Sequence, residues 1–356
     1  MGSRIRSVGI YFPKRELGNF ELERILAASG QETSNEWMIQ RTGITKRRIA
    51  RKDETPGTMA VQAARDALER LKRDIPPIGH IVVASNSAER MFPNIAGLVQ
   101  DELIKSHSGM IDHNAAGSDP HAGCGGINIA LMYADALVGS GFYETVLAIG
   151  TEKLSAITDY SDRGTCVLFG DGAIAYAVTR NKGRGGFVGH EARGKGVDRE
   201  VISCEENMEK VTFEEAVRAV EEVRAPVKTR GRVLLMDGRA VYKYVEKEWL
   251  QLIKGFKDNR KLNPNGIAFS ELAFISPHLA NLRMLTALER GNPGFLRKCG
   301  LSSDGENEYF FNNSTASQGR RDRQFLKNAR PGDHLLKFGY GAELCSCANL
   351  YQMPED

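Results

Sequence analysis

The first half of the chain alternates between short apolar runs and longer stretches whose apolar residues recur every three or four positions. Short apolar runs are typical of strands, and the longer spacing is typical of amphipathic helices. The pattern predicts strands over residues 5–13, 78–85 and 144–152. It predicts helices over residues 19–29, 55–71, 92–104 and 125–139. Asn19 is expected to cap the first helix, and residues 167–180 are interpreted as a hairpin around a glycine turn.

The pattern weakens over residues 181–230, which are richer in Gly, Arg and Glu, and then resumes. We therefore expect this segment to connect two halves, 1–180 and 231–356. In the second half the pattern predicts helices over 238–256 and 281–290, a strand over 272–278, and a strand, glycine loop and strand over 333–353. Two halves of comparable layout indicate a layered α/β fold with an internal duplication.

The composition narrows the classes of function. The chain has 356 residues, 41% of them hydrophobic, which is enough for two domains with a sizeable core. A net charge of +3 argues against a broad nucleic-acid surface, and no apolar run approaches the roughly 20 residues that span a membrane. Six cysteines without a CxxC pair do not form a disulfide framework. Because the N-terminus also lacks a signal-peptide pattern, we predict a cytoplasmic protein with reduced thiols.

Cys124 lies in the stretch SDPHAGCGGINIAL, between glycines and directly before a predicted helix. A helix N-terminus offers unpaired N–H groups and the positive end of the helix dipole, and both favour the thiolate, which is the reactive form of cysteine. The neighbouring glycines would let a substrate backbone approach closely. We interpret Cys124 as a nucleophile, and the alternative is a small buried residue of the core.

Two other stretches place polar side chains where a predicted strand ends. His278 follows a strand and Pro277, and its alternative role is to cap the next helix. Asn312 and Asn313 precede a run of small residues, where helix capping is again the alternative. A cysteine accepts an acyl group, and imidazole and amide groups stabilise an oxyanion or an enolate. Together the three groups suit thioester exchange followed by carbon–carbon bond formation.

Five motifs follow one another along the chain. They are SNEWMIQRTGITKRRIA (34–50), DPHAGCGG (119–126), SDRGTCVLFGDGAIA (161–175), SPHLANLRM (276–284) and NNSTAS (312–317). In this order and spacing they resemble motifs of the β-ketoacyl-acyl carrier protein synthase III family, within the thiolase superfamily. One such motif alone is a weak signal, whereas five in order are specific. The resemblance covers most of the chain and implies a thiolase-like α-β-α-β-α fold with two pseudo-duplicated halves.

The resemblance also implies a role for each residue of the site. Cys124 would be the acylated nucleophile, and His278 and Asn313 would stabilise the enolate that forms on decarboxylation. We prefer Asn313 to Asn312 because the run Ser-Thr-Ala-Ser follows it directly. The backbone N–H groups of the oxyanion hole would belong to Cys124, Tyr340 and Gly341.

Substrate and partner positions follow from the same resemblance. Those that match coenzyme A-binding positions are Trp37, Arg41, Arg163 and Asn281, the last of which also assists the histidine. Those that match positions docking the acidic carrier protein are Lys243 and Arg283. Phe92 matches a position that crosses a dimer interface into the neighbour's acyl pocket, so the resemblance implies a homodimer. Coenzyme A or phosphopantetheine would carry the substrates as thioesters, and we expect no permanently bound cofactor, no nicotinamide and no metal.

The chain departs from the family pattern in three places. Extra residues between Phe92 and Cys124 occupy a region near the family's acyl pocket, which leaves the acyl chain length open. Glu343 introduces a carboxylate near the expected oxyanion hole, either as an acid or base or as an outward-facing strand residue. His121 stands three residues before the nucleophile, where a small residue is more usual, and is a candidate substrate contact. These departures indicate a specialised relative of the fatty-acid initiator.

We therefore predict a condensing acyltransferase. An acyl thioester would acylate Cys124, and a malonyl- or β-ketoacyl-thioester would then react at its α-carbon, in a secondary-metabolite or fatty-acid-like pathway. One alternative is acyl transfer to oxygen or nitrogen without decarboxylation, against which an asparagine in place of a carboxylate base counts. Another is a non-catalytic partner subunit of a different synthase, against which the complete set of cysteine, histidine and asparagine counts.

Overall fold

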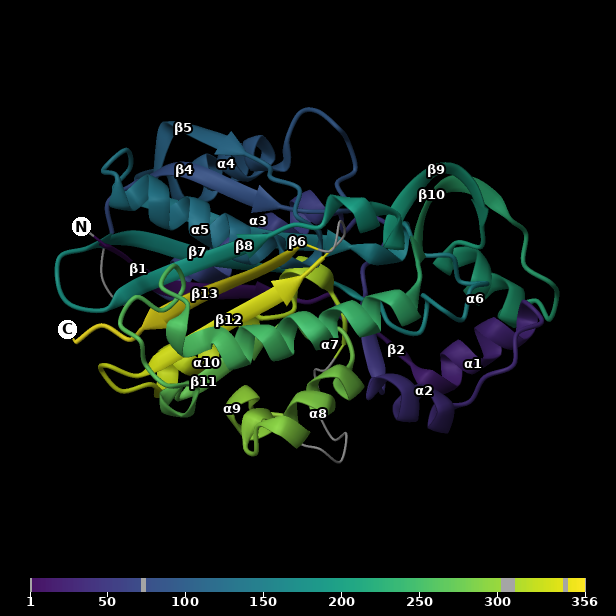
Figure 1. Ribbon diagram of the computed structural model, residues 1–356. Helices are drawn as coiled ribbons and strands as arrows, with labels where there is room; N and C mark the ends of the chain where they lie inside the picture. Colours follow the sequence, from purple (N-terminus) through teal and green to yellow (C-terminus); the bar gives the residue numbers. More distant parts are fainter. Residues whose placement is uncertain (1, 72–74, 302–310, 342–344, 356) are drawn as a thin grey trace.

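The computed structural model describes residues 2–71, 75–301, 311–341 and 345–355, in which two β-sheets and the helices around them form successive layers (Figure 1). The first sheet has the strand order β1 (Gly2–Tyr11), β7 (Asp171–Asn181), β6 (Thr145–Lys153), β4 (Ile78–Ala84) and β5 (Ile111–Ser118). Strand β7 is antiparallel to both of its neighbours, whereas β4 is parallel to β6 and to β5. Strand β6 is buried along almost its whole length, which explains the near-continuous apolar run in its sequence.

The second sheet has the strand order β11 (Phe274–Pro277), β12 (His334–Tyr340), β13 (Ser346–Gln352) and β8 (Gly186–Arg193). Strands β11 and β12 are parallel, and the other neighbours are antiparallel. Strand β8 belongs to the segment 181–230, which we expected only to connect two halves. The division of the chain at residues 180 and 230 stays a prediction, and the start of the middle segment pairs with the second sheet.

The helices form three layers around these sheets (Figure 1). Helices α3 (Pro56–Glu69) and α4 (Ile95–His107) cover the outer face of the first sheet. The outer face of the second sheet is covered by α7 (Gly238–Gly255), α8 (Leu282–Gly291) and α9 (Phe295–Cys299). Helices α5 (Gly126–Gly139) and α10 (Gly319–Asn328) contact strands of both sheets and lie between them. This α-β-α-β-α order confirms the predicted layered fold.

The remaining elements form a lobe beside the two sheets, on the right in Figure 1. They are β2 (Arg15–Gly18), α1 (Asn19–Ala28), α2 (Asn35–Thr42), β3 (Lys46–Ile49), β9 (Ile202–Lys210), α6 (Phe213–Glu221) and β10 (Thr229–Met236). Helices α1 and α6 pack together through a shared apolar cluster that contains Leu22, Ile25 and Phe213. Short 3-10 turns occur at Ser108–Met110, Gly123–Gly125 (η2), Leu154–Ala156, Gly196–Val201, Phe256–Asp258, Phe269–Glu271 and Ser314–Ala316 (η7).

Two local expectations were wrong because distant segments bind the residues involved. Gly18 holds the N-cap position of α1, while the Asn19 side chain donates to the Ile44 carbonyl and accepts from the buried Arg47. Residues 167–180 do not form a hairpin, since the chain before β7 runs alongside the second half. There the Gly170 N–H donates to the carbonyl of Asn312 at 2.9 Å.

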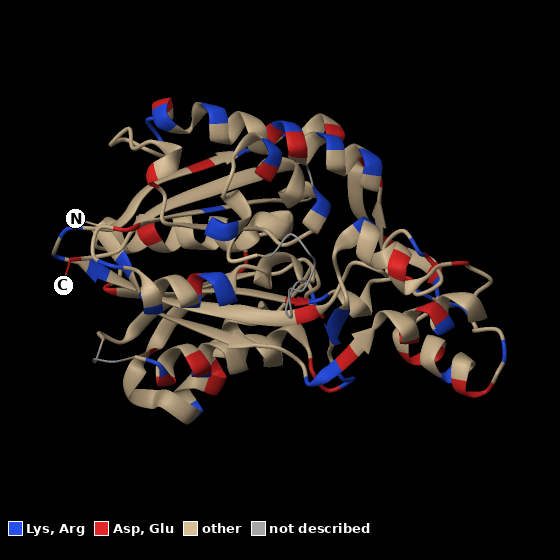
Figure 2. Ribbon diagram, turned by 90° about the horizontal axis from the view of Figure 1, so that it is seen from below, with Lys and Arg blue, Asp and Glu red and all other residues tan. Residues whose placement is uncertain are grey.

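Positions of Lys and Arg are interspersed with positions of Asp and Glu along the outer helices and loops (Figure 2). This mixture agrees with the small net charge of +3. Among the helices of the described ranges, none combines the length and the apolarity that crossing a membrane would require.

Candidate active site

A cavity of about 210 Å³ lies beside Cys124 and is built from distant parts of the chain. Its apolar lining residues are Leu154, Ile157, Phe169, Ile202, Leu234, Met236 and Val241. Its polar and glycine lining residues are Asn86, His121, Gly123, Cys124, Ser203, Cys204, His278, Asn312, Ser314 and Tyr340. The paired strands β9 and β10 therefore help to enclose a cavity in which the predicted cysteine and histidine meet.

Cys124 occupies the middle of the η2 turn, which leads directly into α5. Gly123 before it has a φ of +53°, a left-handed conformation that favours glycine. Gly341 packs so closely that a Cβ atom there would lie 2.4 Å from the backbone nitrogen of Cys124. Only a residue without a side chain fits at position 341, so Gly341 packs directly against the backbone of the nucleophile.

The Cys124 thiol is partly exposed to the cavity but poorly solvated. Burial raises the pKa of Cys124 to about 12, and a hydrogen bond with the Ser314 side chain lowers it by less. We expected the helix start to favour the thiolate, and the structure corrects this expectation because desolvation is the larger effect. The thiol is protonated at neutral pH, so it must lose its proton as it attacks a substrate.

His278 is fully buried at the end of β11 and lines the same cavity. Its Nδ1 atom lies 2.8 Å from the Ser317 hydroxyl oxygen, which also accepts from the Leu279 N–H. The Ser317 proton is thus free to donate to Nδ1, and the ring proton then resides on Nε2, which has no partner within the described residues. Burial lowers the pKa of His278 to about 3. The imidazole is therefore a neutral hydrogen-bond donor at physiological pH.

We predict that His278 makes the folded protein sensitive to acid. The unfolded chain binds a proton at the ordinary histidine pKa of about 6.5, whereas the folded protein resists protonation until about pH 3. Stability therefore falls as the pH drops through this window, by about 2 kcal/mol at pH 5. The free energy of unfolding of His278→Gln, measured in urea at pH 5, 6 and 7, should no longer show this decrease with falling pH. An unchanged decrease would contradict the burial of an uncharged ring.

The structure places Asn312, rather than Asn313, in the lining of the cavity, and the choice between the two stays a prediction. Asn312 lines the cavity, and its Oδ1 atom accepts from the Ser314 N–H at 3.0 Å, which leaves the Nδ2 amide to donate. Asn313 is buried and does not line the cavity. Its Nδ2 atom lies beside Gly172, 3.1 Å from the position that a Cβ atom on that glycine would take. Asn312 is therefore the better-placed candidate for the third predicted group, while the buried Nδ2 atom of Asn313 has no partner within the described residues.

Comparisons with known proteins agree with this geometry. Residues 118–196 match the family model described as 3-oxoacyl-[acyl-carrier-protein] synthase III. The β-ketoacyl-[acyl-carrier-protein] synthase III of Syntrophomonas wolfei is 34% identical over 292 residues, which are 82% of this chain and 80% of that protein. The chain belongs to the β-ketoacyl-acyl carrier protein synthase III family. This confirms the resemblance inferred from the five motifs.

Solved structures extend the likeness to the whole fold. The synthase III of Thermus thermophilus is 29% identical, with a TM-score of 0.78 over 99% of this chain and all of that chain. The priming β-ketosynthase from the R1128 polyketide pathway is 26% identical, with a TM-score of 0.75 over 99% of this chain and 96% of that one. The synthase III fold thus accounts for all the layers described above.

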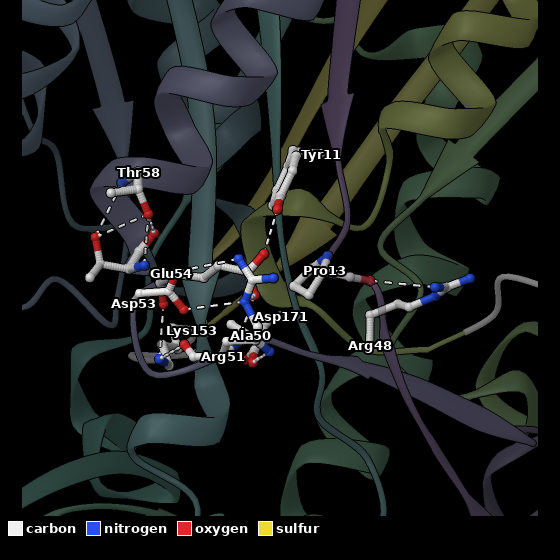
Figure 3. Close-up of polar contacts among 11 residues, drawn as sticks. Tyr11, Pro13, Arg48, Ala50, Arg51, Asp53, Glu54, Thr58, Lys153 and Asp171 are labelled. Carbon is white, nitrogen blue, oxygen red and sulfur yellow. Dashed lines mark hydrogen bonds and ion pairs between the residues drawn. The ribbon is translucent and has the colours of Figure 1, made fainter.

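Two of the synthase III motifs also hold the fold together. The Asp171 carboxylate, from the motif 161–175, accepts a hydrogen bond from the Ala50 N–H at 2.7 Å (Figure 3). It also accepts a hydrogen bond from the Ser155 hydroxyl at 2.6 Å. Ala50 ends the motif 34–50. A buried carboxylate therefore fastens the two motifs to each other near the end of β6.

The structure brings together some of the family's expected coenzyme A positions. The Arg163 guanidinium lies 4.6 Å from the centre of the Trp37 ring, so these two stack on one another. Arg41 is exposed in the last turn of α2. Asn281 instead caps α8, where its side chain accepts from the Arg283 N–H at 2.9 Å, and it does not line the cavity.

The other expected positions lie outside the cavity or beyond the described residues. Lys243 and Arg283 are exposed, and the Arg283 guanidinium lies 5.8 Å from the ring of Tyr242. Phe92 is 80% exposed. Glu343 lies outside the described residues.

The predicted oxyanion hole requires one correction. The Gly341 N–H donates to the Cys345 carbonyl at 2.9 Å and is not available to a substrate in this structure. Tyr340 lines the cavity, and its ring packs edge-on against His278 at 5.3 Å. The backbone N–H groups of Cys124 and Tyr340 stay candidates. His121 lines the cavity, as its position before the nucleophile suggested.

Sequence reasoning missed several polar residues that support the site. They are Asn86, Glu152, Ser314 and Ser317, all of which bond to one another or to His278 and Cys124. Glu152 carried a signal, because a carboxylate at the end of a predicted buried strand is rare unless it is paired. In the described ranges no group of three or more His, Cys, Asp or Glu could hold a metal ion.

Proposed function

We propose that this protein is a condensing acyltransferase that joins an acyl group to a malonyl- or β-ketoacyl-thioester. The observation that carries the proposal is the meeting of Cys124, neutral His278 and the Asn312 amide in one cavity. A thiol can accept the acyl group, and two uncharged donors stabilise negative charge on a carbonyl oxygen without neutralising it by proton transfer. Relatives of this chain are named β-ketoacyl-[acyl-carrier-protein] synthase III, and this name supports the same reaction.

The reaction proceeds in two stages. First, the Cys124 sulfur attacks the carbonyl carbon of an acyl thioester, a new thioester forms, and the carrier thiol leaves with the Cys124 proton. Second, a malonyl-thioester loses carbon dioxide, and the electron pair moves onto its thioester oxygen as an enolate. The Nε2–H of His278 and the Nδ2–H of Asn312 donate to that oxygen. The enolate carbon then attacks the acyl group, and the Cys124 thiolate leaves and recovers a proton.

The supporting positions carry further parts of the proposal. The Trp37 and Arg163 stack would open to hold the adenine of coenzyme A, with Arg41 at its phosphates, because both side chains bind flat aromatic groups well. Exposed Lys243 and Arg283 would dock an acidic carrier protein. We also propose a cytoplasmic homodimer in which the exposed Phe92 reaches the neighbouring subunit, since a large exposed aromatic side chain suits an interface.

The proposed division of labour predicts different losses in two adjacent variants. Asn312→Ala should still take up an acyl group at Cys124, because acylation does not need the enolate donor, but release of carbon dioxide from malonyl-thioester should fall at least about 100-fold. Asn313→Ala should decarboxylate at close to the normal rate if it folds. Acyl uptake is measured by intact mass and decarboxylation by release of labelled carbon dioxide.

This pair of variants also tests the alternatives. Loss of decarboxylation in Asn313→Ala but not in Asn312→Ala would return the role to Asn313. Acyl transfer from Cys124 to an alcohol or amine, with no carbon dioxide released by the normal protein, would replace condensation by simple acyl transfer. Absence of any acyl mass from a panel of acyl thioesters would favour a non-catalytic subunit.

A further inference from the structure

A carboxylate lies directly behind the active-site cavity. Glu152, in β6, is fully buried and does not itself line the cavity. Its oxygens accept hydrogen bonds from the side chains of Asn86 at 2.7 Å, Ser87 at 2.6 Å and Ser314 at 3.0 Å, and from the Asn86 N–H. The lining residues Asn86 and Ser314 thus separate Glu152 from the substrate. A buried carboxylate is costly, so this set of donors is what allows it to persist there.

Ser314 connects this carboxylate to the nucleophile. Its backbone has a φ of +48°, which is unusual for a residue with a side chain and indicates local strain. In this conformation the Ser314 hydroxyl donates to Glu152 at 3.0 Å, and Ser314 lines the cavity together with Cys124, whose pKa the Ser314 side chain lowers through a hydrogen bond. The Asn86 amide also donates to the Ser314 oxygen at 3.2 Å. The hydroxyl is therefore held between a thiol that must lose a proton and a carboxylate that can accept one.

Two histidines line the cavity: His121 is exposed, whereas the buried His278 is poorly suited to this task. Taking the Cys124 proton would turn His278 into a buried imidazolium, and burial lowers the pKa of that ring to about 3. Burial has the opposite effect on Glu152, whose pKa it raises. Moving a proton from thiol to carboxylate transfers the negative charge from one buried group to another and creates no new charge. Physical chemistry thus favours the carboxylate as the proton acceptor.

We propose that Glu152 takes up the Cys124 proton through the Ser314 hydroxyl when the nucleophile attacks. The thiol proton passes to the Ser314 oxygen as the Ser314 proton passes to Glu152. The sulfur lone pair forms a bond to the thioester carbonyl carbon, and the bond to the departing sulfur then breaks and leaves its electron pair on that sulfur. The proton returns along the same path to the departing sulfur. Glu152 acts through Ser314, so it is a positioning residue, and its role in acylation rests on the function proposed above.

The pH dependence of Cys124 alkylation tests this relay without any acyl substrate. Iodoacetamide reacts with the thiolate, and the reaction is followed by mass spectrometry of the peptide that contains Cys124. In the unmodified protein the relay supplies a thiolate without proton loss to solvent, so the rate should be nearly independent of pH around neutrality. In Glu152→Gln and in Ser314→Ala the rate at pH 7 should fall at least about tenfold and rise about tenfold per pH unit.

Simple electrostatics predicts the reverse outcome, which makes the test decisive. Glu152 as a nearby negative charge raises the pKa of Cys124. If that were its whole effect, Glu152→Gln would lower the thiol pKa and alkylate faster than the unmodified protein. Equal or faster alkylation in Glu152→Gln at pH 7, or a tenfold rise per pH unit in the unmodified protein, would overturn the relay.

Two controls separate the relay from a loss of structure. Glu152→Asp keeps a carboxyl group and should retain part of the pH-independent rate, even if Glu152→Gln folds poorly. Glu54→Gln removes another buried carboxyl group, which bonds to Tyr11 and to the Arg51 N–H (Figure 3), and should leave the alkylation profile unchanged. A pH-independent rate with no acylation by any thioester would sustain the relay and refute the proposed function. Acylation of Cys124 by a thioester, without a pH-independent rate of alkylation, would sustain the proposed function and refute the relay.

Discussion

Cys124→Ser is expected to lose acylation altogether when the protein is mixed with acyl-coenzyme A. The serine hydroxyl is a much weaker nucleophile than a thiol at the same position, and the relay cannot offset that difference. We expect the overall rate to fall at least about 10⁴-fold, because removal of the nucleophile removes the covalent route itself. Intact mass spectrometry detects the acyl adduct directly, and peptide mapping locates it.

The other cysteines provide the matched comparison. Cys299 is buried in α9, within the apolar cluster of the second sheet, and Cys299→Ala should acylate as the unmodified protein does. Cys166 and Cys345 should carry no label. Acyl groups found equally on either of these two cysteines would contradict the assignment of Cys124.

Asp322→Asn is expected to cause a large loss of stability. The Asp322 carboxylate, in α10, bonds to the Lys337 ammonium in β12 and to the Tyr176 hydroxyl in β7, and all three side chains are buried. This group joins the middle helix layer to both sheets. Removing the carboxylate charge leaves a buried ammonium without a counter-charge, which typically costs about 3–5 kcal/mol. Urea unfolding at pH 7 should show the loss as a lower midpoint with an unchanged slope.

Two further variants show whether the buried charge is the cause. Asp322→Leu combined with Lys337→Met replaces both charged groups by apolar ones, and it should recover most of the lost stability. Asp53→Asn removes a partner from the exposed pair with Arg51 (Figure 3) and should leave the midpoint unchanged. Full stability of Asp322→Asn would show that Lys337 loses its proton readily, which is also the direction in which burial moves its pKa.

Local patterns in the sequence predicted the elements that are regular and well buried. The helical spacing over residues 238–256 corresponds to α7, and the apolar run over 144–152 corresponds to β6. The cysteine between glycines predicted a turn before a helix, which is the η2 turn before α5. These features depend on side-chain spacing and backbone freedom, both of which are written in the local sequence.

Pairing between distant segments decided what the local pattern could not. Strand β8 forms because β13, more than 150 residues later, supplies its hydrogen-bond partners. The weak periodicity over residues 186–193 therefore did not predict this strand. Asn312 forms an isolated bridge with Phe169, and both residues line the cavity, an arrangement that the local sequence does not indicate. Sequence spacing alone left both asparagines open.

The chemical state of the site also depends on the folded environment. The sequence by itself determined that a cysteine, a histidine and an asparagine were available, each beside the end of a strand or the start of a helix. The tertiary structure decided that the Cys124 thiol and the His278 ring are both uncharged, because burial disfavours the charged form of each. It also placed Glu152, which lies 28 residues after the nucleophile in the chain, behind Ser314. Desolvation and through-space contacts arise only when the sheets close around the cavity, and they therefore leave little trace in the order of residues.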